Sequence, residues 1–193
     1  DLGYRSGTPV VVRMNDDTWA VVTGNGYNSD NDKAFLFVIN LSTGALIKKI
    51  PTNNDENNGL ATPFVTDWPE RNLRAQRIYA GDLLGNLWAF DVSGNTNQWT
   101  NQNQRRILFT ATDDSDVAQP ITSRPYGARI SDSKAMITLG TGSYFRTADA
   151  NDTQVQSLYG IIDHASVPNN PTSVARTDLL EQEIIYQGKV GDS

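Results

Sequence analysis

The residues with the clearest potential for chemistry are oxygen-bearing side chains in one polar segment. Asn28, Asp30 and Asp32 alternate along the chain, as the first ligands of an EF-hand calcium loop do. Lys33 stands where such a loop needs glycine, and Ile39 stands where it needs the bidentate glutamate. Two interpretations follow, a calcium site at Asn28, Asp30 and Asp32 or a solvated loop between strands. The missing second half of the motif favours the solvated loop.

Catalysis by a nucleophile or by a general acid–base pair has little support. Cysteine is absent, and the single histidine, His164, follows an apolar run where a turn is expected, so we predict a surface histidine. The glycine pairs Gly24/Gly26 and Gly140/Gly142 resemble parts of a phosphate loop. Strands are expected on both sides of each pair, without the helix N-terminus that holds an anion. The sequence therefore predicts no catalytic residue.

Charge and hydrophobicity exclude two classes of partner. The 193 residues include 22 acidic and 16 basic side chains, a formal net charge of -6, whereas nucleic-acid binding needs a clustered basic face. No apolar run approaches the roughly 20 residues that span a bilayer. We therefore expect neither nucleic-acid binding nor a membrane-spanning segment. Because the chain begins at Asp1, we expect it to be part of a longer protein whose export signal lies elsewhere.

The elements that position these residues are expected to be short strands joined by turns. Abundant Gly, Asn, Asp, Ser and Thr favour such a structure. The best-defined hairpin lies at Arg77–Gly94, with Ile78–Ala80 and Leu87–Phe90 as its strands. Asp82 and Gly85 begin and end its turn. An aspartate in that place accepts a hydrogen bond from the backbone two residues further on.

The strand order around this hairpin recurs along the chain. Prolines open three successive units, 54 and 57 residues apart, at Pro9, Pro63 and Pro120. Glycines end the second strand of each unit, 57 and 59 residues apart, at Gly24, Gly81 and Gly140. Four short antiparallel strands in about 40–50 residues are typical of a β-propeller blade. A β-sandwich with regular spacing is the alternative, but two markers in register favour the propeller.

We therefore predict an all-β fold in which residues 1–193 are part of one β-propeller domain. Its four-stranded antiparallel blades are expected at about 7–50, 60–110 and 118–165. Residues 166–193 are expected to form a loop and the start of a further blade, near Ile184–Tyr186. Propellers typically have about 4–8 blades. Three blades do not close a ring, so we expect a propeller fragment or an open arc.

The four tryptophans divide into two groups by their expected positions. Trp19 and Trp88 lie on predicted strands, where large aromatic side chains usually pack. Trp68 and Trp99 lie in polar loops. We expect the first pair to pack between blades and the second pair to be exposed contact residues.

Several blocks of the sequence resemble a known family. They are Gly24–Ser29, Ala61–Pro63, Tyr79–Asp91, Gly140–Tyr144, Gln156–Ile161 and Arg176–Leu179. In this order the blocks resemble the C-terminal, quinoprotein-like β-propeller of the PilC/PilY-type proteins, which are biogenesis factors and adhesins at the tip of type IV pili. The resemblance covers nearly the whole chain. It implies an exported, non-enzymatic protein at the pilus tip, cell surface or outer membrane of a Gram-negative bacterium.

The same resemblance implies partners and a metal. The partners would be minor pilins and other parts of the pilus tip, and in some members a host or abiotic surface. Family members have a calcium loop before the block that begins at Arg77, linked to pilus extension and retraction. The side-chain oxygens of the corresponding segment, Thr66–Gln76, belong to Asp67, Glu70, Asn72 and Gln76. This segment lacks alternating carboxylates, and Arg71 and Arg74 bring charge of the same sign as calcium.

Two functional hypotheses from different classes follow. The first is an interaction protein that acts through loops between strands, at Tyr27–Lys33, Thr66–Gln76 and Phe145–Val155. The second is a quinone-dependent dehydrogenase propeller, which would need calcium, a catalytic aspartate and residues that clamp the cofactor. Because the sequence offers no such set, the interaction protein is the favoured hypothesis.

Overall fold

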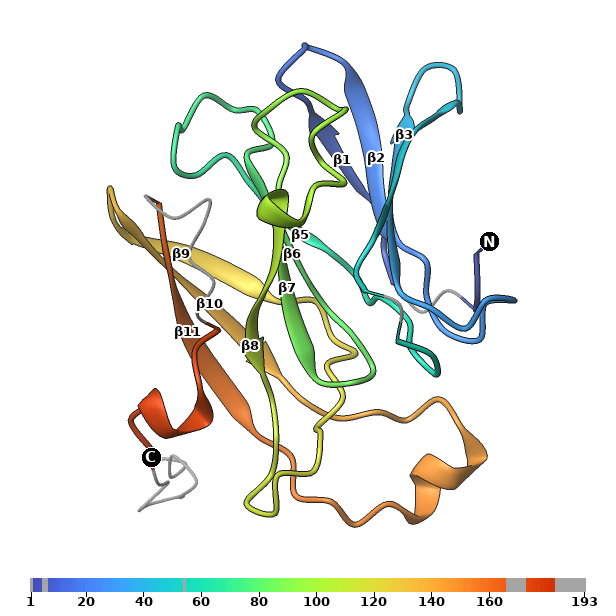
Figure 1. The fold of residues 1–193 in the computed structure, drawn as a ribbon, viewed down its shortest axis with the longest axis vertical. Helices are drawn as coiled ribbons and strands as arrows, with labels where there is room; N and C mark the ends of the chain where they lie inside the picture. Colours follow the sequence, from blue (N-terminus) through green and yellow to red (C-terminus); the bar gives the residue numbers. More distant parts are fainter. Residues whose placement is uncertain (1, 5–6, 54, 166–172, 183–193) are drawn as a thin grey trace, which may run out of the picture.

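The computed structural model describes residues 2–4, 7–53, 55–165 and 173–182. They form three antiparallel sheets in which strands consecutive in sequence lie side by side (Figure 1). Blade 1 contains β1 (Val10–Arg13), β2 (Trp19–Gly24), β3 (Phe35–Asn40) and β4 (Leu46–Pro51). Blade 2 contains β5 (Phe64–Thr66), β6 (Arg77–Gly81), β7 (Asn86–Asp91) and β8 (Arg105–Thr110). Blade 3 contains β9 (Tyr126–Ser131), β10 (Lys134–Gly140) and β11 (Leu158–His164). The expected all-β class is confirmed.

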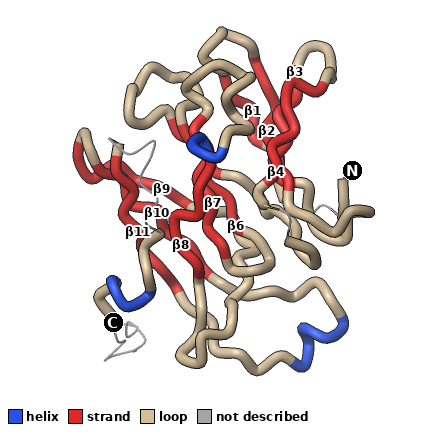
Figure 2. Tube along the Cα trace, in the orientation of Figure 1, coloured by secondary structure: helices blue, strands red, loops and turns tan. Residues whose placement is uncertain are grey.

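Helical structure in the described ranges is limited to short 3₁₀ turns (Figure 2). They are η1 (Gln102–Gln104), η2 (Thr147–Asn151) and η3 (Arg176–Asp178). In this part of the chain, no helix has the length and apolar character needed to cross a membrane.

The predicted hairpin forms around Asp82. Strands β6 and β7 pair from Arg77 opposite Asp91 to Gly81 opposite Leu87. The Asp82 carboxylate accepts a hydrogen bond from the N–H of Leu84, two residues further on, at 3.0 Å. Gly85 has a φ of +81°, a conformation that costs glycine little.

The first strand of blade 3 differs from the prediction. Pro9 and Pro63 directly precede β1 and β5, and the proline in the same place before β9 is Pro125, not Pro120. Residues Tyr126–Ser131 include Gly, Ala, Arg and Ser, so the β-branched run that marks β1 is missing there. The sequence pattern was therefore too weak to locate this strand.

Within the described residues, blade 3 shows three of its four expected strands. Its sheet has the order β11-β10-β9 and contains three strands within the described residues, where four were predicted. The predicted start of a further blade at Ile184–Tyr186 lies outside the described residues.

Apolar cores fill the two spaces between neighbouring blades. In blade 2, Ile78 and Phe90 face blade 1, while Tyr79 and Ala89 face blade 3, because alternate residues of a strand point to opposite faces. In blade 3, by contrast, Met136 and its neighbours leave one sheet face exposed. Blade 3 thus ends the arc with an exposed sheet face, as expected of a propeller fragment.

The tryptophans correct three of the four expectations. Trp88 is buried in the core between blades 1 and 2, as predicted. Trp19 is 54% exposed on β2, whereas the loop residues Trp68 and Trp99 are only 3% and 4% exposed. Tertiary contacts explain the burial of the two loop tryptophans. The Arg77 guanidinium lies 4.7 Å from the centre of the Trp68 ring, and the Trp99 indole donates to the carbonyl of Gly94.

Strand direction sorts the loops onto two ends of the molecule. The lower end in Figure 1 carries the β2–β3 loop (25–34), the β6–β7 turn (82–85) and the β10–β11 loop (141–157). The upper end carries the β1–β2 turn (14–18) and the β5–β6 loop (67–76). The three loops expected to bind partners therefore do not share one surface, because Thr66–Gln76 lies opposite the other two.

Candidate functional site

The lower end brings together the two other loops that the sequence indicated. The rings of Tyr27 and Phe145 lie 4.7 Å apart at an angle of 34°. This contact joins the β2–β3 loop of blade 1 to the β10–β11 loop of blade 3. Next to it, Tyr144 is 79% exposed. The lower end therefore presents the Tyr144 side chain to solvent, on a loop that the Tyr27–Phe145 contact joins to blade 1.

Asp149 orders the first half of the β10–β11 loop. Its Oδ2 accepts hydrogen bonds from the Ser143 hydroxyl at 2.7 Å and from the N–H groups of Phe145 and Arg146 at 2.8 and 3.0 Å. The Ser143 hydroxyl and these two N–H groups lower the pKa of the Asp149 carboxyl. The charged form thus stabilises the loop that carries the exposed aromatic residues.

The second half of the loop is held by two glutamine amides. Gln154 Nε2 donates to Asp113 Oδ2 at 2.9 Å, and Gln119 Nε2 donates to the carbonyl of Val155 at 2.7 Å. Both bonds reach the connection between blades 2 and 3. The loop is therefore part of the folded structure and suited to present a surface.

Replacing Asp149 by alanine is expected to loosen this loop without unfolding the blade. Hydrogen exchange of residues 143–151, corrected for intrinsic rates, should become several-fold faster because three hydrogen bonds are lost. Since the pKa of Asp149 is lowered, its contribution is present above the unfolded value of about 3.9 and is lost as the pH falls further. Asp152→Ala, which removes an acceptor only for Gln154 N–H, should leave exchange in 143–149 unchanged. Equal exchange rates in wild type and Asp149→Ala would contradict this role.

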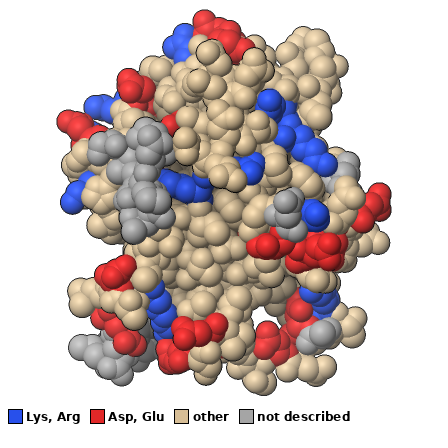
Figure 3. All heavy atoms as spheres, viewed as in Figure 1, with Lys and Arg blue, Asp and Glu red and all other residues tan. Residues whose placement is uncertain are grey.

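Exposed acidic side chains lie on the loops near this surface. Figure 3 shows several groups of Asp and Glu side chains, with Lys and Arg side chains among them, towards the lower end of the face in view. The exposed carboxylates there include Asp30, Asp55, Glu56, Asp114, Asp116 and Asp152. An exposed apolar centre with a charged rim is the usual composition of a protein-binding surface.

One polar position is used in the same way in all three blades. The residue after the last glycine of the second strand is Asn25, Asp82 or Thr141. The side-chain oxygen of each accepts a backbone N–H at or directly before the first residue of the third strand, from Phe35, Asn86 or Ser157 respectively. The loop between these strands has 10, 4 or 17 residues in blades 1, 2 and 3. This hydrogen bond joins the two ends of the loop, so the length of the loop can vary while the strands stay paired.

Asp82 accepts the most hydrogen bonds of these three side chains. It is fully buried, and its Oδ1 also accepts the N–H of Leu84. Its Oδ2 accepts hydrogen bonds from Asn58 Nδ2, Asn86 Nδ2 and Trp88 Nε1 at 3.0, 3.1 and 2.8 Å. Five donors thus surround one carboxylate. Asp82 is a structural residue, as the sequence indicated.

A second buried carboxylate joins blades 2 and 3. Asp163 forms ion pairs with Arg77 at 2.7 Å and with Arg106, and it accepts the Tyr79 hydroxyl at 2.6 Å. Burial, and next the charge of Asp163, raise the pKa of Tyr79 well above its usual value, so this phenol stays protonated and donates. His164, the neighbouring residue, is exposed, as expected. No local sequence pattern predicts this cluster.

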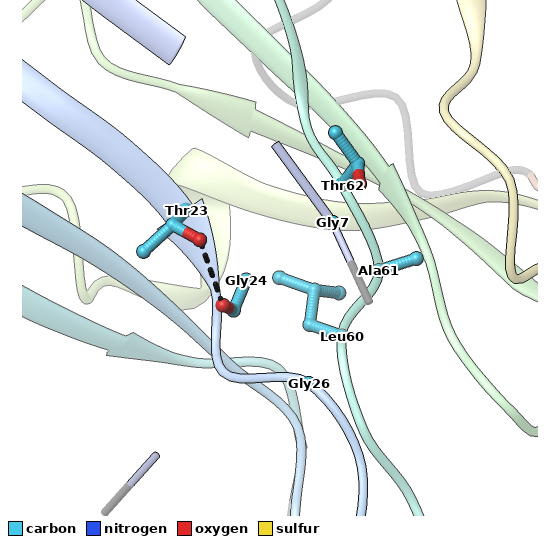
Figure 4. A pocket seen from close by; sticks show the side chains of 7 residues that line it. All are labelled: Gly7, Thr23, Gly24, Gly26, Leu60, Ala61 and Thr62. Atoms are coloured by element: carbon cyan, nitrogen blue, oxygen red, sulfur yellow. Dashed lines mark hydrogen bonds between the residues drawn. The ribbon is translucent and has the colours of Figure 1, made fainter. Parts of the chain in front are cut away.

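A narrow depression between blades 1 and 2 serves packing. It is lined by Gly7, Thr23, Gly24, Gly26, Leu60, Ala61 and Thr62 (Figure 4). A Cβ atom at Gly24 would lie 2.3 Å from the carbonyl oxygens of Leu60 and Ala61. The two backbones are therefore in direct contact, which only glycine permits.

The first candidate calcium segment is held by its backbone. The N–H of Asn58 donates to the carbonyl of Asp32 at 3.0 Å, and the N–H of Asp32 donates to the carbonyl of Ser29 at 2.8 Å. The side chains of Asn28 and Asp30 are exposed. Calcium binding by Asn28, Asp30 and Asp32 stays a prediction.

The second candidate set, Asp67, Glu70, Asn72 and Gln76, lies in the β5–β6 loop at the upper end. Glu70 and Asn72 are exposed, whereas Gln76 is buried. Among the residues that the structure describes, no three His, Asp or Glu side chains gather as a metal site would require. Within this loop, Asp67 Oδ2 accepts the N–H of Leu73, and Asn72 Oδ1 accepts the N–H of Arg74 and the amide of Gln76. Calcium binding by this set stays a prediction.

Comparison with known proteins places these features in a family context. Residues 1–190 match the family model described as the PilY1 beta-propeller domain. The chain is 38% identical over 204 residues to a type IV pilus biogenesis factor PilY1 of Pseudomonas aeruginosa, with 92% of this chain and 18% of that protein covered. It is 39% identical over 191 residues to a PilY1 homolog of Xylella fastidiosa, with 98% and 14% covered.

A solved structure is similar as well. The crystal structure of the Pseudomonas aeruginosa PilY1 C-terminal domain superimposes with a TM-score of 0.79 and 35% sequence identity, covering 93% of this chain and 41% of that chain. The chain spans less than a fifth of the length of the Pseudomonas aeruginosa and Xylella fastidiosa relatives described above. The resemblance to a PilC/PilY-type propeller, and with it the propeller fragment, is confirmed.

Proposed function

Because this chain belongs to the PilY1 β-propeller domain family, we propose that it acts in type IV pilus biogenesis as a non-enzymatic binding module. The observation that carries the proposal is the family match over residues 1–190. Relatives named as pilus biogenesis factors are 38–40% identical over nearly the whole chain. The module would work by contact with other proteins.

The lower end supports this proposal best as a contact surface. Its β10–β11 loop is anchored by Asp149 and Gln154 and exposes Tyr144. Exposed aromatic side chains on ordered loops are frequent hot spots of binding. The acidic rim favours a partner with basic residues around an apolar centre, because complementary charge speeds and orients association.

The buried carboxylates support a structural role over a catalytic one. Asp82 and Asp163 are the buried acidic residues of the described chain, and donors from several strands surround both. A catalytic acid or base must instead reach a substrate proton. The quinone-dependent dehydrogenase gains no support from the relatives, which are named as pilus biogenesis factors.

The partners and location follow from the family. Minor pilins and other components of the pilus tip are the proposed partners, and the cell surface of a Gram-negative bacterium is the proposed location. Adhesion to a host or abiotic surface would be a further use of the same exposed loops.

Replacing Tyr144 by alanine in the full-length protein is expected to reduce the number of surface pili and twitching motility. The reason is the loss of an exposed aromatic contact, while the amount of folded protein should stay unchanged because Tyr144 is not part of the core. Pili are counted by electron microscopy in cells that express only the variant. Leu41→Ala, at an exposed turn of the upper end, serves as the control and should behave as wild type. Normal piliation with Tyr144→Ala would count against the lower end as the contact surface.

A further inference from the structure

The amide of Gln76 is oriented by its neighbours in the buried part of the β5–β6 loop. Asn15 Nδ2 donates to the carbonyls of Ala75 and Val92 at 2.7 and 3.3 Å. The oxygen of Asn15 must therefore face Gln76, whose Nε2 donates to it at 2.8 Å. Because the network fixes the flip of both amides, Gln76 turns its N–H₂ group, not its oxygen, towards the loop.

Asn72 receives the second hydrogen of the same amide. Gln76 Nε2 donates to Asn72 Oδ1 at 3.2 Å, and the N–H of Arg74 donates to the same oxygen at 3.0 Å. In addition, Asp67 Oδ2 accepts the N–H of Leu73 at 3.2 Å. Two of the four candidate side chains, Asp67 and Asn72, thus already accept hydrogen bonds, and a third, Gln76, turns a donor towards the loop.

Two arginine side chains, Arg74 and Arg13, bring positive charge to the region between the β5–β6 loop and the β1–β2 turn. Arg74 Nε and Nη2 lie 2.7 and 2.6 Å from Asp17 Oδ1, and Arg13 Nε lies 3.2 Å from the same oxygen. The N–H of Ala75 donates to the carbonyl of Arg13 at 2.8 Å. The β5–β6 loop of blade 2 is therefore attached to the β1–β2 turn of blade 1.

Calcium needs six to eight oxygen ligands at about 2.3–2.6 Å. A loop whose centre holds an N–H₂ donor, and which is attached to its neighbour by an arginine, does not fit this requirement. We infer that residues 67–76 form a calcium-independent clamp between blades 1 and 2, in which Gln76 and Arg74 make the cross-links. The clamp does not depend on the proposed pilus partners, so its test is separate from the test of the proposed function.

The consequence is local and measurable. Residues 66–76 and the β1–β2 turn should keep the same order with and without calcium. Removing a cross-linking side chain should release both segments together, because each holds the other.

Hydrogen exchange with mass spectrometry on the full-length protein tests the clamp. In wild type, exchange of residues 66–76 should be equal in EDTA and in about 1 mM calcium, the weak end of extracellular calcium sites. Gln76→Ala and Arg74→Ala should each speed exchange there and in residues 13–18 by about tenfold, the effect of losing one or two hydrogen bonds. Calcium should not restore protection in either variant.

Arg71→Ala is the matched control. Arg71 lies in the same loop and is exposed, so its removal changes the loop charge but leaves the cross-links intact, and exchange should match wild type. Calcium-dependent protection in wild type that Asp67→Ala abolishes would overturn the inference. Unchanged exchange in both Gln76→Ala and Arg74→Ala would overturn it as well.

Discussion

Asp163→Ala is expected to lower the free energy of unfolding by about 3–5 kcal/mol, the usual cost of removing one partner of a buried ion pair. Asp163 is 1% exposed and Arg77 is 6% exposed. Without the carboxylate, two guanidinium groups keep their charge at the interface of blades 2 and 3, and the Tyr79 hydroxyl loses its acceptor. Urea unfolding of the full-length protein, with the transition of the propeller followed by tryptophan fluorescence, measures the change.

An exposed ion pair on the same blade provides the control. Arg129 pairs with Asp132, whose side chain is 92% exposed. Asp132→Ala should therefore change the free energy of unfolding by no more than about 0.5 kcal/mol. Similar small effects of Asp163→Ala and Asp132→Ala would mean that the buried cluster does not hold the blades together.

Asp82→Asn is expected to destabilise the propeller by about 3 kcal/mol, although the two side chains have nearly the same shape. The three donors at Oδ2 come from Asn58, Asn86 and Trp88. An amide N–H₂ in that place is itself a donor and leaves them unpaired in a fully buried site. Turning the amide over would leave the two backbone N–H donors at Oδ1 unpaired instead. The same unfolding measurement applies, and loss of the indole hydrogen bond should shift the emission of Trp88.

Asp91→Asn is the matched control within the same hairpin. Asp91 Oδ1 accepts the N–H and hydroxyl of Ser93, and an asparagine oxygen accepts both bonds equally well. The change in free energy should stay below about 1 kcal/mol. If Asp82→Asn were as mild as Asp91→Asn, the five-donor arrangement would not be important for stability.

Local sequence signals predicted the parts of the fold that depend on local chemistry. Turn residues and the alternation of apolar and polar residues predict the all-β class and the hairpin around Asp82. They also predict the glycines that end the second strands, at Gly24, Gly81 and Gly140. The error at Pro120 arose because the repeat marker was taken from spacing, while the strand after Pro125 has weak β propensity.

Contacts between distant residues could not be predicted in this way. Arg77 and Asp163 are 86 positions apart, and neither carries a local sign of its partner. The polar segments around Trp68 and Trp99 predict exposed loops, yet tertiary packing buries both side chains. The Thr66–Gln76 loop lies opposite the other two loops for a different reason. It joins the first and second strands of its blade, whereas the other two loops join second and third strands.

The most direct test of the account is the affinity of the full-length protein for purified minor pilins, measured for wild type, Tyr144→Ala, Tyr144→Phe and Leu41→Ala. The account predicts that wild type binds and that Tyr144→Ala binds at least about tenfold more weakly. Tyr144→Phe and Leu41→Ala should bind as wild type does. Equal affinity of wild type and Tyr144→Ala, or no binding to any minor pilin, would contradict the proposal that the lower end is the pilus contact surface.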